Sequence, residues 1–370
     1  MRGLSNLIEI PNRVNLATQV ADVIRKTIGQ GIWGKEIPSE RRLSELLKVS
    51  RPTIRVALHM LAKDGLLEIS PRTRKRLLGG RSHTATPPKK TVGIITHEQI
   101  TRLGLSYYVH ITEFIVRLSE EGFAVEIFVC KPIRGFSQSE KLDKFLRENR
   151  ILCCLLLSVN KVVQCWFAER SFPALVLGSC HDSVRLPSID IDLRAVCRHA
   201  AGVFLTHGHR RLALIVPDSG LAGDLASEAG FKEGAQLHAD TGKEVRSVII
   251  RHDGTFQNIT AKLERIFDAA EAPTALLVAK PWPTFAVLIY LLKRGLAVPD
   301  SVSLIARDQD FFFETIDPKI SHYRFKDNAY TQRAAHLIMK IVHQGNLPPV
   351  PNLVYPDFFE GGTVVRNRSG

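Results

Sequence analysis

The stretch "IPSERRLSELLKVSRPTIRVALHMLAKDGLLEIS", residues 37–70, decides the fold of the first part of the chain. Ser39 and Ser50 can each cap a helix, and each precedes a segment whose apolar residues recur at helical spacing. Pro52 falls in the first turn of the second segment, where its missing N–H costs nothing, and Gly65 ends that segment. The predicted inner face of the first helix consists of Leu43, Leu46 and Leu47. The stretch therefore predicts two short helices joined by a tight turn, which is a helix-turn-helix.

The second predicted helix, which runs from Ser50 to Asp64, has two unlike faces. Its predicted inner face consists of Ile54, Ala57, Leu58 and Leu61. Arg51 and Arg55 lie on the outer face, and an Arg can bond O6 and N7 of one guanine at once. Ser50 and Thr53 can bind phosphate or base edges. We therefore expect this helix to enter the major groove of DNA. The alternative is a solvated helix whose arginines only keep it soluble.

The predicted helices have neighbours on both sides in the sequence. Before them, Leu16, Val20, Val23, Ile24 and Ile28 give one face of a helix between residues 15 and 30. After them, "LLEIS" predicts one short strand and "LLGG" predicts the start of a second strand. The basic turn between these strands predicts a wing that contacts phosphates or the minor groove through Arg72, Arg74 and Lys75.

The charge of the chain is unevenly distributed. The net charge is +13, and the first 90 residues hold 18 Lys/Arg against 7 Asp/Glu, whereas the remainder holds 32 against 30. A compact basic module beside a nearly neutral one is typical of a domain that binds a polyanion and is attached to a second domain. Charge alone leaves a basic solvated surface as the alternative.

The composition argues against several protein classes. The six cysteines show no Cys-x-x-Cys spacing and read as buried thiols of a cytosolic protein. The histidines show no metal-ligand spacing, and neither a GxSxG nor a Walker-type loop occurs. The chain also lacks a signal-peptide pattern and an apolar run that could span a bilayer. We expect a cytoplasmic protein without catalytic residues, metal, cofactor or membrane partner.

The rest of the chain alternates strands and helices from "TVGIITHE", residues 91–98, onwards. This rhythm predicts an α/β fold with parallel sheets covered on both faces. About 280 residues are too many for one small sheet, so we expect two doubly wound lobes with a ligand in the cleft between them, at the carboxyl ends of strands. The predicted boundaries are a DNA-binding domain at 1–80, a linker at 81–90 and a two-lobed domain at 91–370, with lobe 1 at about 91–190 and 324–350 and lobe 2 at about 191–322 and 353–366.

The quoted stretch strongly resembles the winged-helix domain of the GntR family of regulators, over about residues 12–79. The resemblance implies that four residues occupy the family's DNA-contact positions: Arg41, Arg51, Thr53 and Arg55. Two features depart from the family. Lys48 stands in the turn where the family usually has Gly, a position that often requires a left-handed backbone. Pro71 and Arg72 stand where the family usually has a Gly-rich wing tip.

Several later segments resemble the effector domain of the LacI/GalR-type repressors, which is built like a periplasmic sugar-binding protein. Among them are "LPSIDIDLRAVCRHAAGVFLTHGHRRLALI" and "LLKRGLAVPDSVSLIARD". The resemblance implies three crossings between lobes, near Asp190–Leu193, Ser321–Phe325 and Leu353–Phe358. A GntR head on a LacI-type body resembles the arabinose-repressor-like architecture, which implies a sugar as effector.

Departures from this second family concern the ligand site. The family often has an Arg three residues before the Gly-Phe pair that matches Gly230-Phe231, and this chain has Ser227 there. An Asn-Asp pair is replaced by Lys280-Pro281. Of two Asp residues after a strand, the first is kept as Asp308 and the second is Gln309.

Candidate effector residues follow from these matches. Asp308 and Asp190 lie at a strand end and at a crossing, and such a carboxylate can accept hydrogen bonds from sugar hydroxyls. Lys280 can replace the missing Arg or favour an anionic ligand. Three aromatic residues can stack on a sugar face: Tyr107, Trp282 and Phe312. The plainer alternatives are a helix cap for Asp308, core or interface packing for the aromatic residues, and a solvated Lys280.

Three classes of function remain. The favoured one is a repressor that binds a palindromic DNA operator as a homodimer and responds to a sugar-like effector. The second is an enzyme-like body fused to a DNA-binding head, which requires a pyridoxal-phosphate lysine. The third is a constitutive DNA-binding protein without an effector.

Overall fold

The computed structural model describes residues 16–29, 37–63, 66–69, 76–78, 90–97, 105–130, 137–237, 244–325 and 329–367. The chain divides into two compact units, Met1–Pro88 and Lys89–Gly370. The predicted wing residues Arg72, Arg74 and Lys75 lie outside the described residues, and so does the predicted linker as far as residue 89. In the described parts, no helix has both the length and the apolar character needed to cross a membrane.

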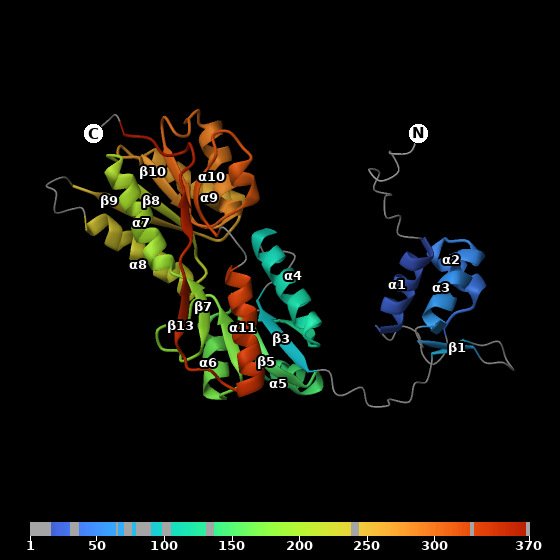
Figure 1. Ribbon diagram of the computed structural model, residues 1–370. Helices are drawn as coiled ribbons and strands as arrows, with labels where there is room; N and C mark the ends of the chain where they lie inside the picture. The colour runs from blue at the N-terminus through green and yellow to red at the C-terminus, as the bar shows by residue number, and fades with distance from the viewer. Residues whose placement is uncertain are drawn as a thin grey trace, which may run out of the picture. The chain divides into compact units, whose positions relative to one another are not determined.

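The first unit contains the expected helices followed by a pair of short strands (Figure 1). The helices are Leu16–Gly29 (α1), Glu40–Leu47 (α2) and Arg51–Lys63 (α3), and the strands are Leu67–Ile69 (β1) and Arg76–Leu78 (β2). The two strands pair antiparallel, with Leu67 opposite Leu78. Their arrangement agrees with the base of the predicted wing.

The core of the first unit follows the predicted pattern on α3 and departs from it on the other helices. Ile54, Ala57, Leu58 and Leu61 are all buried, as predicted. Leu46 on α2 is 52% exposed and Val23 on α1 is 49% exposed, although both were expected to face inward. Each helix packs mainly on α3, so its apolar stripe is wider than the surface that this one neighbour covers.

The turn between α2 and α3 explains the departure at Lys48. Its backbone is left-handed, with φ 52° and ψ 38°, and its N–H bonds to the carbonyl of Ser44. The Ser44 hydroxyl also donates to the carbonyl of Val49 at 2.6 Å. These bonds hold a conformation that costs a non-glycine residue roughly 1–2 kcal/mol, so lysine is tolerated at this position.

The second unit is built on two six-stranded sheets. In the first lobe the strand order is β13-β7-β6-β5-β3-β4, and every recorded pairing is parallel. Its strands are Thr91–Thr96 (β3), Ala124–Val129 (β4), Ile151–Leu157 (β5), Ala174–Leu177 (β6), Ser188–Ile191 (β7) and Pro351–Val354 (β13), and its helices are Leu105–Glu120 (α4), Ser137–Glu148 (α5), Lys161–Glu169 (α6) and Ala329–Gln344 (α11).

In the second lobe the strand order is β14-β12-β11-β10-β8-β9. The sheet is parallel except at its edge, where β14 pairs antiparallel with β12. The strands are Arg211–Pro217 (β8), Arg246–His252 (β9), Ala275–Val278 (β10), Ser303–Ala306 (β11), Ser321–Arg324 (β12) and Asp357–Phe359 (β14). The helices are Leu193–Thr206 (α7), Ala222–Gln236 (α8), Phe256–Phe267 (α9) and Pro281–Lys293 (α10), with a 3₁₀ turn at Phe311–Glu314 (η3).

Helices cover both faces of each sheet, as the sequence predicts. In the second lobe Ile215 and Leu304 point to the core under α9 and α10, whereas their neighbours Leu214 and Ile305 point to the core under α7 and α8. The first lobe repeats this arrangement, with α4 and α11 on one face and α5 and α6 on the other. The chain passes between lobes after β7, after β12 and after β13, near the three expected crossings.

A close approach of α7 and α8 positions one wall of the cleft. A Cβ atom on Gly230 would lie only 2.0 Å from the carbonyl oxygen of Arg194, so a side chain cannot be accommodated there without separating the helices. This contact holds α8 close against α7. As a result, Asp224 and Ser227 on α8 face the end of β11.

Candidate functional sites: a DNA-reading helix and an inter-lobe cavity

The outer face of α3 presents the predicted DNA-contact residues to solvent. Arg51 at the first position of the helix and Arg55 one turn later are both exposed. The Ser50 hydroxyl accepts from the N–H of Thr53 at 3.4 Å and lies 2.8 Å from the Thr53 hydroxyl. Ser50 therefore acts as the helix cap, and it holds Thr53 at the end of α3 where the dipole is positive.

Arg55 has a partner that the sequence did not reveal. Its Nε donates to Oε1 of Glu40 at 3.3 Å and its Nη2 donates to Oε2 at 3.1 Å. This bond to Glu40 raises the pKa of Arg55. The pairing occupies one edge of the guanidinium and leaves the edge between Nη1 and Nη2 available for a guanine. Glu40 lies in the first turn of α2, so this contact depends on the packing of α2 against α3.

Arg41 extends the same basic surface from α2. Its side chain is exposed, and its Nε donates to Glu45 at 3.2 Å, one helical turn away. Such an exposed pair contributes little stability, so Arg41 can exchange Glu45 for a phosphate at small cost.

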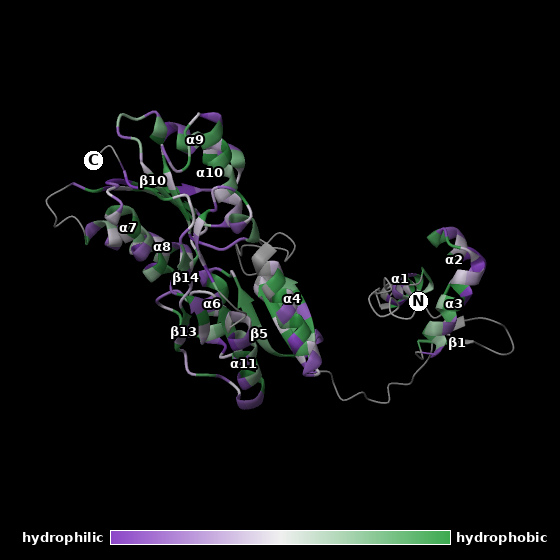
Figure 2. Ribbon diagram, turned by 45° about the horizontal axis from the view of Figure 1, so that its top comes forward, coloured by the Kyte–Doolittle hydropathy of each residue, from purple (hydrophilic) through white to green (hydrophobic). Residues whose placement is uncertain are grey.

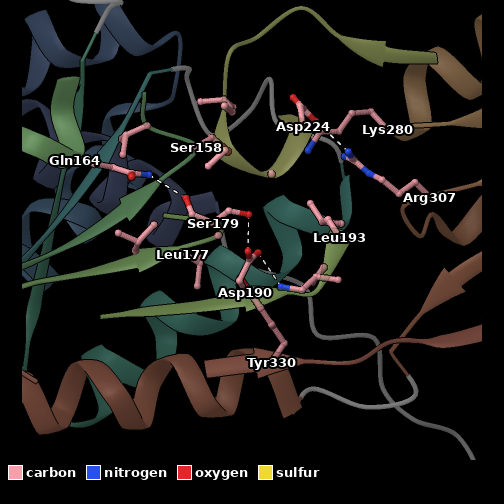
Figure 3. A pocket seen from close by; sticks show the side chains of 17 residues that line it. Ser158, Gln164, Leu177, Ser179, Asp190, Leu193, Asp224, Lys280, Arg307 and Tyr330 are labelled. Carbon is pink, nitrogen blue, oxygen red and sulfur yellow. Dashed lines mark hydrogen bonds and ion pairs between the residues drawn. The ribbon is translucent and has the colours of Figure 1, made fainter. Parts of the chain in front are cut away.

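A cavity of about 70 Å³ lies between the two lobes (Figure 3). The first lobe contributes residues that follow the ends of β5 and β6 or lie on β7, among them Ser158, Ser179 and Asp190. The second lobe contributes Asp224, Lys280 and Arg307. The site therefore lies at the carboxyl ends of parallel strands from both sheets, which is where such folds bind ligands.

Asp190 is a partly buried carboxylate on the first-lobe wall. Burial raises its pKa to about 6, although hydrogen bonds from the Ser179 hydroxyl and the N–H of Ile191 act in the opposite direction. Asp190 was predicted as an effector residue, and it does line the cavity. Its two oxygens retain lone pairs that can accept hydrogen bonds from a ligand.

Arg307, at the end of β11, is the buried cation of the second-lobe wall, with a side chain only 1% exposed. Its Nη1 donates to Asp224 at 3.0 Å and to Ser227 at 2.9 Å. Its Nε donates to Asp308 at 2.9 Å, and its Nη2 reaches the other oxygen of Asp308 at 3.4 Å. Burial disfavours the charge, but Asp308 and Asp224 offset it and raise the pKa of Arg307.

Asp308 is thus the counter-ion of Arg307. Burial alone would raise its pKa, but Arg307 and Lys280 more than compensate and hold the pKa at about 2. The backbone N–H of Lys280, which adopts φ 72°, also donates to Asp308 at 2.8 Å. Lys280 lines the cavity, whereas Asp308 lies behind its wall. Asp308 thus bonds to the protein's own arginine and backbone in this structure, and its contact with a sugar stays a prediction.

The predicted aromatic platform is not assembled at this cavity. Trp282 is 54% exposed and its Nε1 donates to the carbonyl of Gly254 at 3.2 Å. Phe312 packs on Phe311, with ring centroids 3.8 Å apart. Neither residue lines the cavity. Both follow strand ends and are exposed. The side chain of Tyr107 lies outside the described residues.

Sequence reasoning missed Arg307, Asp224 and Ser179 as cavity residues. Arg307 immediately precedes the predicted Asp308, so one signal was available: a cation adjacent to a carboxylate at a strand end. Gln309, which replaces the family's second Asp, accepts from the N–H of Phe325 at 2.9 Å and so serves the crossing instead of the cavity.

The described residues offer little for metal or thiol chemistry. Among them, no cluster of His, Cys, Asp and Glu side chains is suited to bind a metal ion. All six cysteines are free thiols, and burial raises the pKa of Cys153 to about 12 and that of Cys180 to about 11. These two thiols therefore stay protonated at neutral pH.

Comparisons with known proteins agree with both parts of this description. Residues 16–75 match the family described as "Bacterial regulatory proteins, gntR family", and residues 201–364 match a "Periplasmic binding protein-like domain". The arabinose metabolism transcriptional repressor of Geobacillus stearothermophilus is 23% identical over 367 residues, which cover 92% of this chain and 93% of that protein. This relative is a transcriptional regulator and not an enzyme.

Solved structures show the same fold. A LacI family regulator from Enterococcus faecium with bound ribose has a TM-score of 0.60 and 16% identity, covering 75% of this chain and 100% of its own. The regulator CelR in complex with cellobiose has a TM-score of 0.63 and 19% identity, covering 89% of this chain and 100% of its own. The chain thus contains a region of the gntR family and a periplasmic-binding-protein-like domain, and over nearly its whole length it is similar to a transcriptional repressor.

Proposed function

We propose that this protein is a transcriptional repressor that binds a palindromic operator as a homodimer. Its affinity for the operator rises or falls when a sugar-like effector occupies the inter-lobe cavity. The observation that carries the proposal is the cavity itself, which is lined from both lobes by buried polar groups at strand ends. Because the two lobes are joined by three crossings, a ligand held by both walls favours one lobe arrangement.

DNA binding is supported by the exposed basic face of α2 and α3. Arg41, Arg51 and Arg55 are exposed cations on a short helix pair, and those at the start of α3 coincide with the positive end of its dipole. The proposed contacts are Arg51 and Arg55 to bases, and Arg41, Ser50 and Thr53 to phosphates or base edges. The wing residues Arg72, Arg74 and Lys75 are proposed as phosphate contacts. A repressor of this kind acts in the cytoplasm, where the DNA lies.

A sugar-like effector is supported by the chemistry of the cavity and by two relatives in fold. The regulators similar in structure include one crystallised with ribose and one with cellobiose. Asp190, Asp224 and Ser179 supply acceptors and a hydroxyl suited to hydroxyl groups of a ligand. Lys280 adds a donor on the opposite wall.

A homodimer is supported by apolar side chains that a monomer leaves uncovered. On α10 and η3 these are Trp282, Ile289, Leu292, Phe311 and Phe312, and Leu292 is 79% exposed. Tyr108, Val109 and Val116 are exposed on α4. Both views show α4 and α10 on the side of the unit opposite α7, and α4 is coloured largely hydrophobic in Figure 2. Patches of this kind mark interaction surfaces.

The dimer can be tested by a charge placed on this surface. Leu292→Glu should shift the protein from dimer to monomer in sedimentation velocity at micromolar concentration. Leu237→Glu, at an exposed apolar position just after α8, is the matched control and should remain dimeric. A dimeric Leu292→Glu variant that binds its operator normally would place the interface elsewhere.

Two alternatives are less well supported. An enzyme-like body would need a cofactor-binding lysine, and Lys280 instead takes part in the charge cluster around Asp308. A constitutive DNA-binding protein needs no cavity between its lobes. Effector-independent operator affinity would favour this second alternative.

The proposed function is tested with the full chain and a random-sequence duplex pool. Repeated selection at about 150 mM salt should enrich an inverted repeat, and the Arg51→Ala/Arg55→Ala double variant should enrich no sequence. The selected duplex is then titrated with sugars, sugar acids and sugar phosphates present. Failure to enrich any sequence would refute operator binding, and unchanged affinity with every compound would refute effector control.

A further inference from the structure

The second-lobe wall of the cavity is organised by one guanidinium. Arg307 lies between Asp224 on α8 and Asp308, with Ser227 beside it, and all three are within hydrogen-bond distance. These partners take four of the five N–H groups that an arginine carries: Nε–H, both on Nη1 and one on Nη2. Since Arg307 lines the cavity, the remaining Nη2–H is available to a ligand.

The same contacts decide which carboxylates face the cavity. Asp308 accepts from Arg307 and from the N–H of Lys280, and it does not line the cavity. Asp224 does line it, although one oxygen accepts from Arg307 and the other from the Ser219 hydroxyl at 2.6 Å. Each of its oxygens keeps one lone pair for a further bond. Arg307 thus withdraws one carboxylate from ligand contact and orients another toward the ligand.

The charges on the second-lobe side of the cavity are balanced, because Arg307 and Lys280 stand against Asp224 and Asp308. Asp190 adds a further carboxylate from the first lobe. A ligand anion would meet cations that are already neutralised and would approach the Asp190 carboxylate. Bringing such a charge into a buried, compensated site is costly, whereas hydroxyl groups can donate to Asp190 and Asp224 without that cost.

We propose that Arg307 is the effector-selecting residue of this cavity and that it selects an uncharged polyhydroxylated compound. The free Nη2–H donates to a hydroxyl or ring oxygen of the compound, and hydroxyl groups of the compound donate to Asp224 and Asp190. This inference rests on the proposed function, because it assumes that the effector binds between the lobes.

The position of Ser227 provides a way to separate ligand selection from stability. Exchanging the two residues, Ser227→Arg with Arg307→Ser, keeps one guanidinium among Asp224 and Asp308 but brings it from α8 instead of β11. Arg307→Lys keeps the charge and loses the fixed planar donor. Arg251→Lys is the matched control, because Arg251 makes a comparable paired contact with Glu228 on α8, at 2.6 and 2.7 Å, and does not line the cavity.

The experiment measures ligand-induced thermal shifts and operator affinity of the full chain. The probes are L-arabinose, D-ribose, other neutral aldoses, sugar alcohols and cellobiose, with D-glucuronate and D-glucose 6-phosphate as charged counterparts. A neutral compound should stabilise the wild-type protein most. Its affinity should fall by about tenfold or more in Arg307→Lys, the loss expected for one hydrogen bond to a charged group, and stay unchanged in Arg251→Lys. The exchange variant should melt within a few degrees of wild type yet prefer a different stereoisomer.

Three results would overturn the inference. They are equal affinities of Arg307→Lys and wild type, an unchanged stereoisomer preference in the folded exchange variant, and a stronger response to a charged counterpart than to any neutral compound. In each case a compound that still alters operator affinity leaves the proposed function standing. A panel in which no compound changes either the melting temperature or operator affinity overturns both.

Discussion

The arginines of the two candidate sites show how differently one residue type can be used. Arg55 on α3 is 66% exposed and pairs with Glu40, fifteen positions away in the sequence. Arg307 in the cleft is 1% exposed and pairs with Asp224, eighty-three positions away. An exposed guanidinium can exchange its partner for DNA at little cost, whereas a buried one is committed to the carboxylates around it. Breaking the buried pair should therefore destabilise the second unit, whereas breaking the exposed pair should alter DNA binding and leave the fold intact.

The largest effect is expected from Asp308→Ala. This change leaves a buried guanidinium with one carboxylate instead of two, and removing one partner of a buried ion pair typically costs about 3–5 kcal/mol. The second unit should therefore lose stability by that amount in urea unfolding followed by tryptophan fluorescence. Asp300→Ala, at an exposed carboxylate of the same lobe, should leave the unfolding midpoint unchanged.

This expectation differs from the role that the sequence suggested for Asp308, which was a direct contact with the effector. A stable Asp308→Ala protein that no longer responds to any effector would restore the sequence-based interpretation. It would also show that the ion pair with Arg307 contributes little to the folded state.

The next effect is expected at the DNA-reading helix. Arg51→Ala or Arg55→Ala should weaken binding to the selected operator by roughly 5- to 150-fold, because a bidentate contact to guanine is lost. Their far-UV circular dichroism and melting temperature should match wild type, since both side chains are exposed. Lys63→Ala, at the opposite end of α3, serves as the control. Undiminished affinity in both arginine variants would mean that another surface reads the operator.

These two sites also differ in how far the sequence could predict them. The helix-turn-helix depends on caps and apolar spacing within one short stretch, so Ile54, Leu58 and the exposed Arg51 were all predicted correctly. Local periodicity could not show that Leu46 would lack a neighbour, because that depends on which helices pack on α2. The pairing of Arg55 with Glu40 depends in the same way on tertiary packing.

In the body, alternation of strands and helices predicted the two-lobed architecture, and strand ends indicated where the cavity lies. Asp190 and Lys280 line it. The sequence could not show the direction in which each side chain leaves a strand end. That direction determines which of the other residues line the cavity. Arg307 lines the cavity and Asp308 does not, and Trp282 and Phe312 are exposed side chains outside its lining.

A third effect concerns pH. Burial raises the pKa of Asp190 to about 6, so the folded protein holds this proton more tightly than the unfolded chain does. The proton's contribution to stability is complete below the unfolded pKa and is lost as the pH rises through about 6. Effector hydroxyls that donate to the ionised carboxylate work in the other direction. Effector affinity should therefore fall by up to about tenfold from pH 6 to pH 5, one pKa unit.

Asp190→Asn isolates this effect, since it keeps the shape of the side chain and removes the titration. Its effector affinity should be flat over the same pH range when measured by calorimetry. A wild-type affinity that rises toward pH 5 would mean that protonated Asp190 donates to the effector, which reverses the assigned role.

The smallest effect, and the one that tests the exposed pair directly, is expected from Glu40→Gln. The amide oxygen can accept from only one edge atom of Arg55, so the guanidinium is held less firmly in the orientation that leaves Nη1 and Nη2 for guanine. Losing a negative charge near the phosphates raises affinity for every duplex. The ratio of operator to scrambled-duplex affinity should therefore drop severalfold while absolute affinity rises.

Asp22→Asn is the control for this change. It breaks the pair with Arg25 on α1, removes the same charge away from α3 and should leave the ratio unchanged. If the ratio is also unchanged in Glu40→Gln, then Glu40 only balances charge, and Arg55 finds its base without being oriented by the protein.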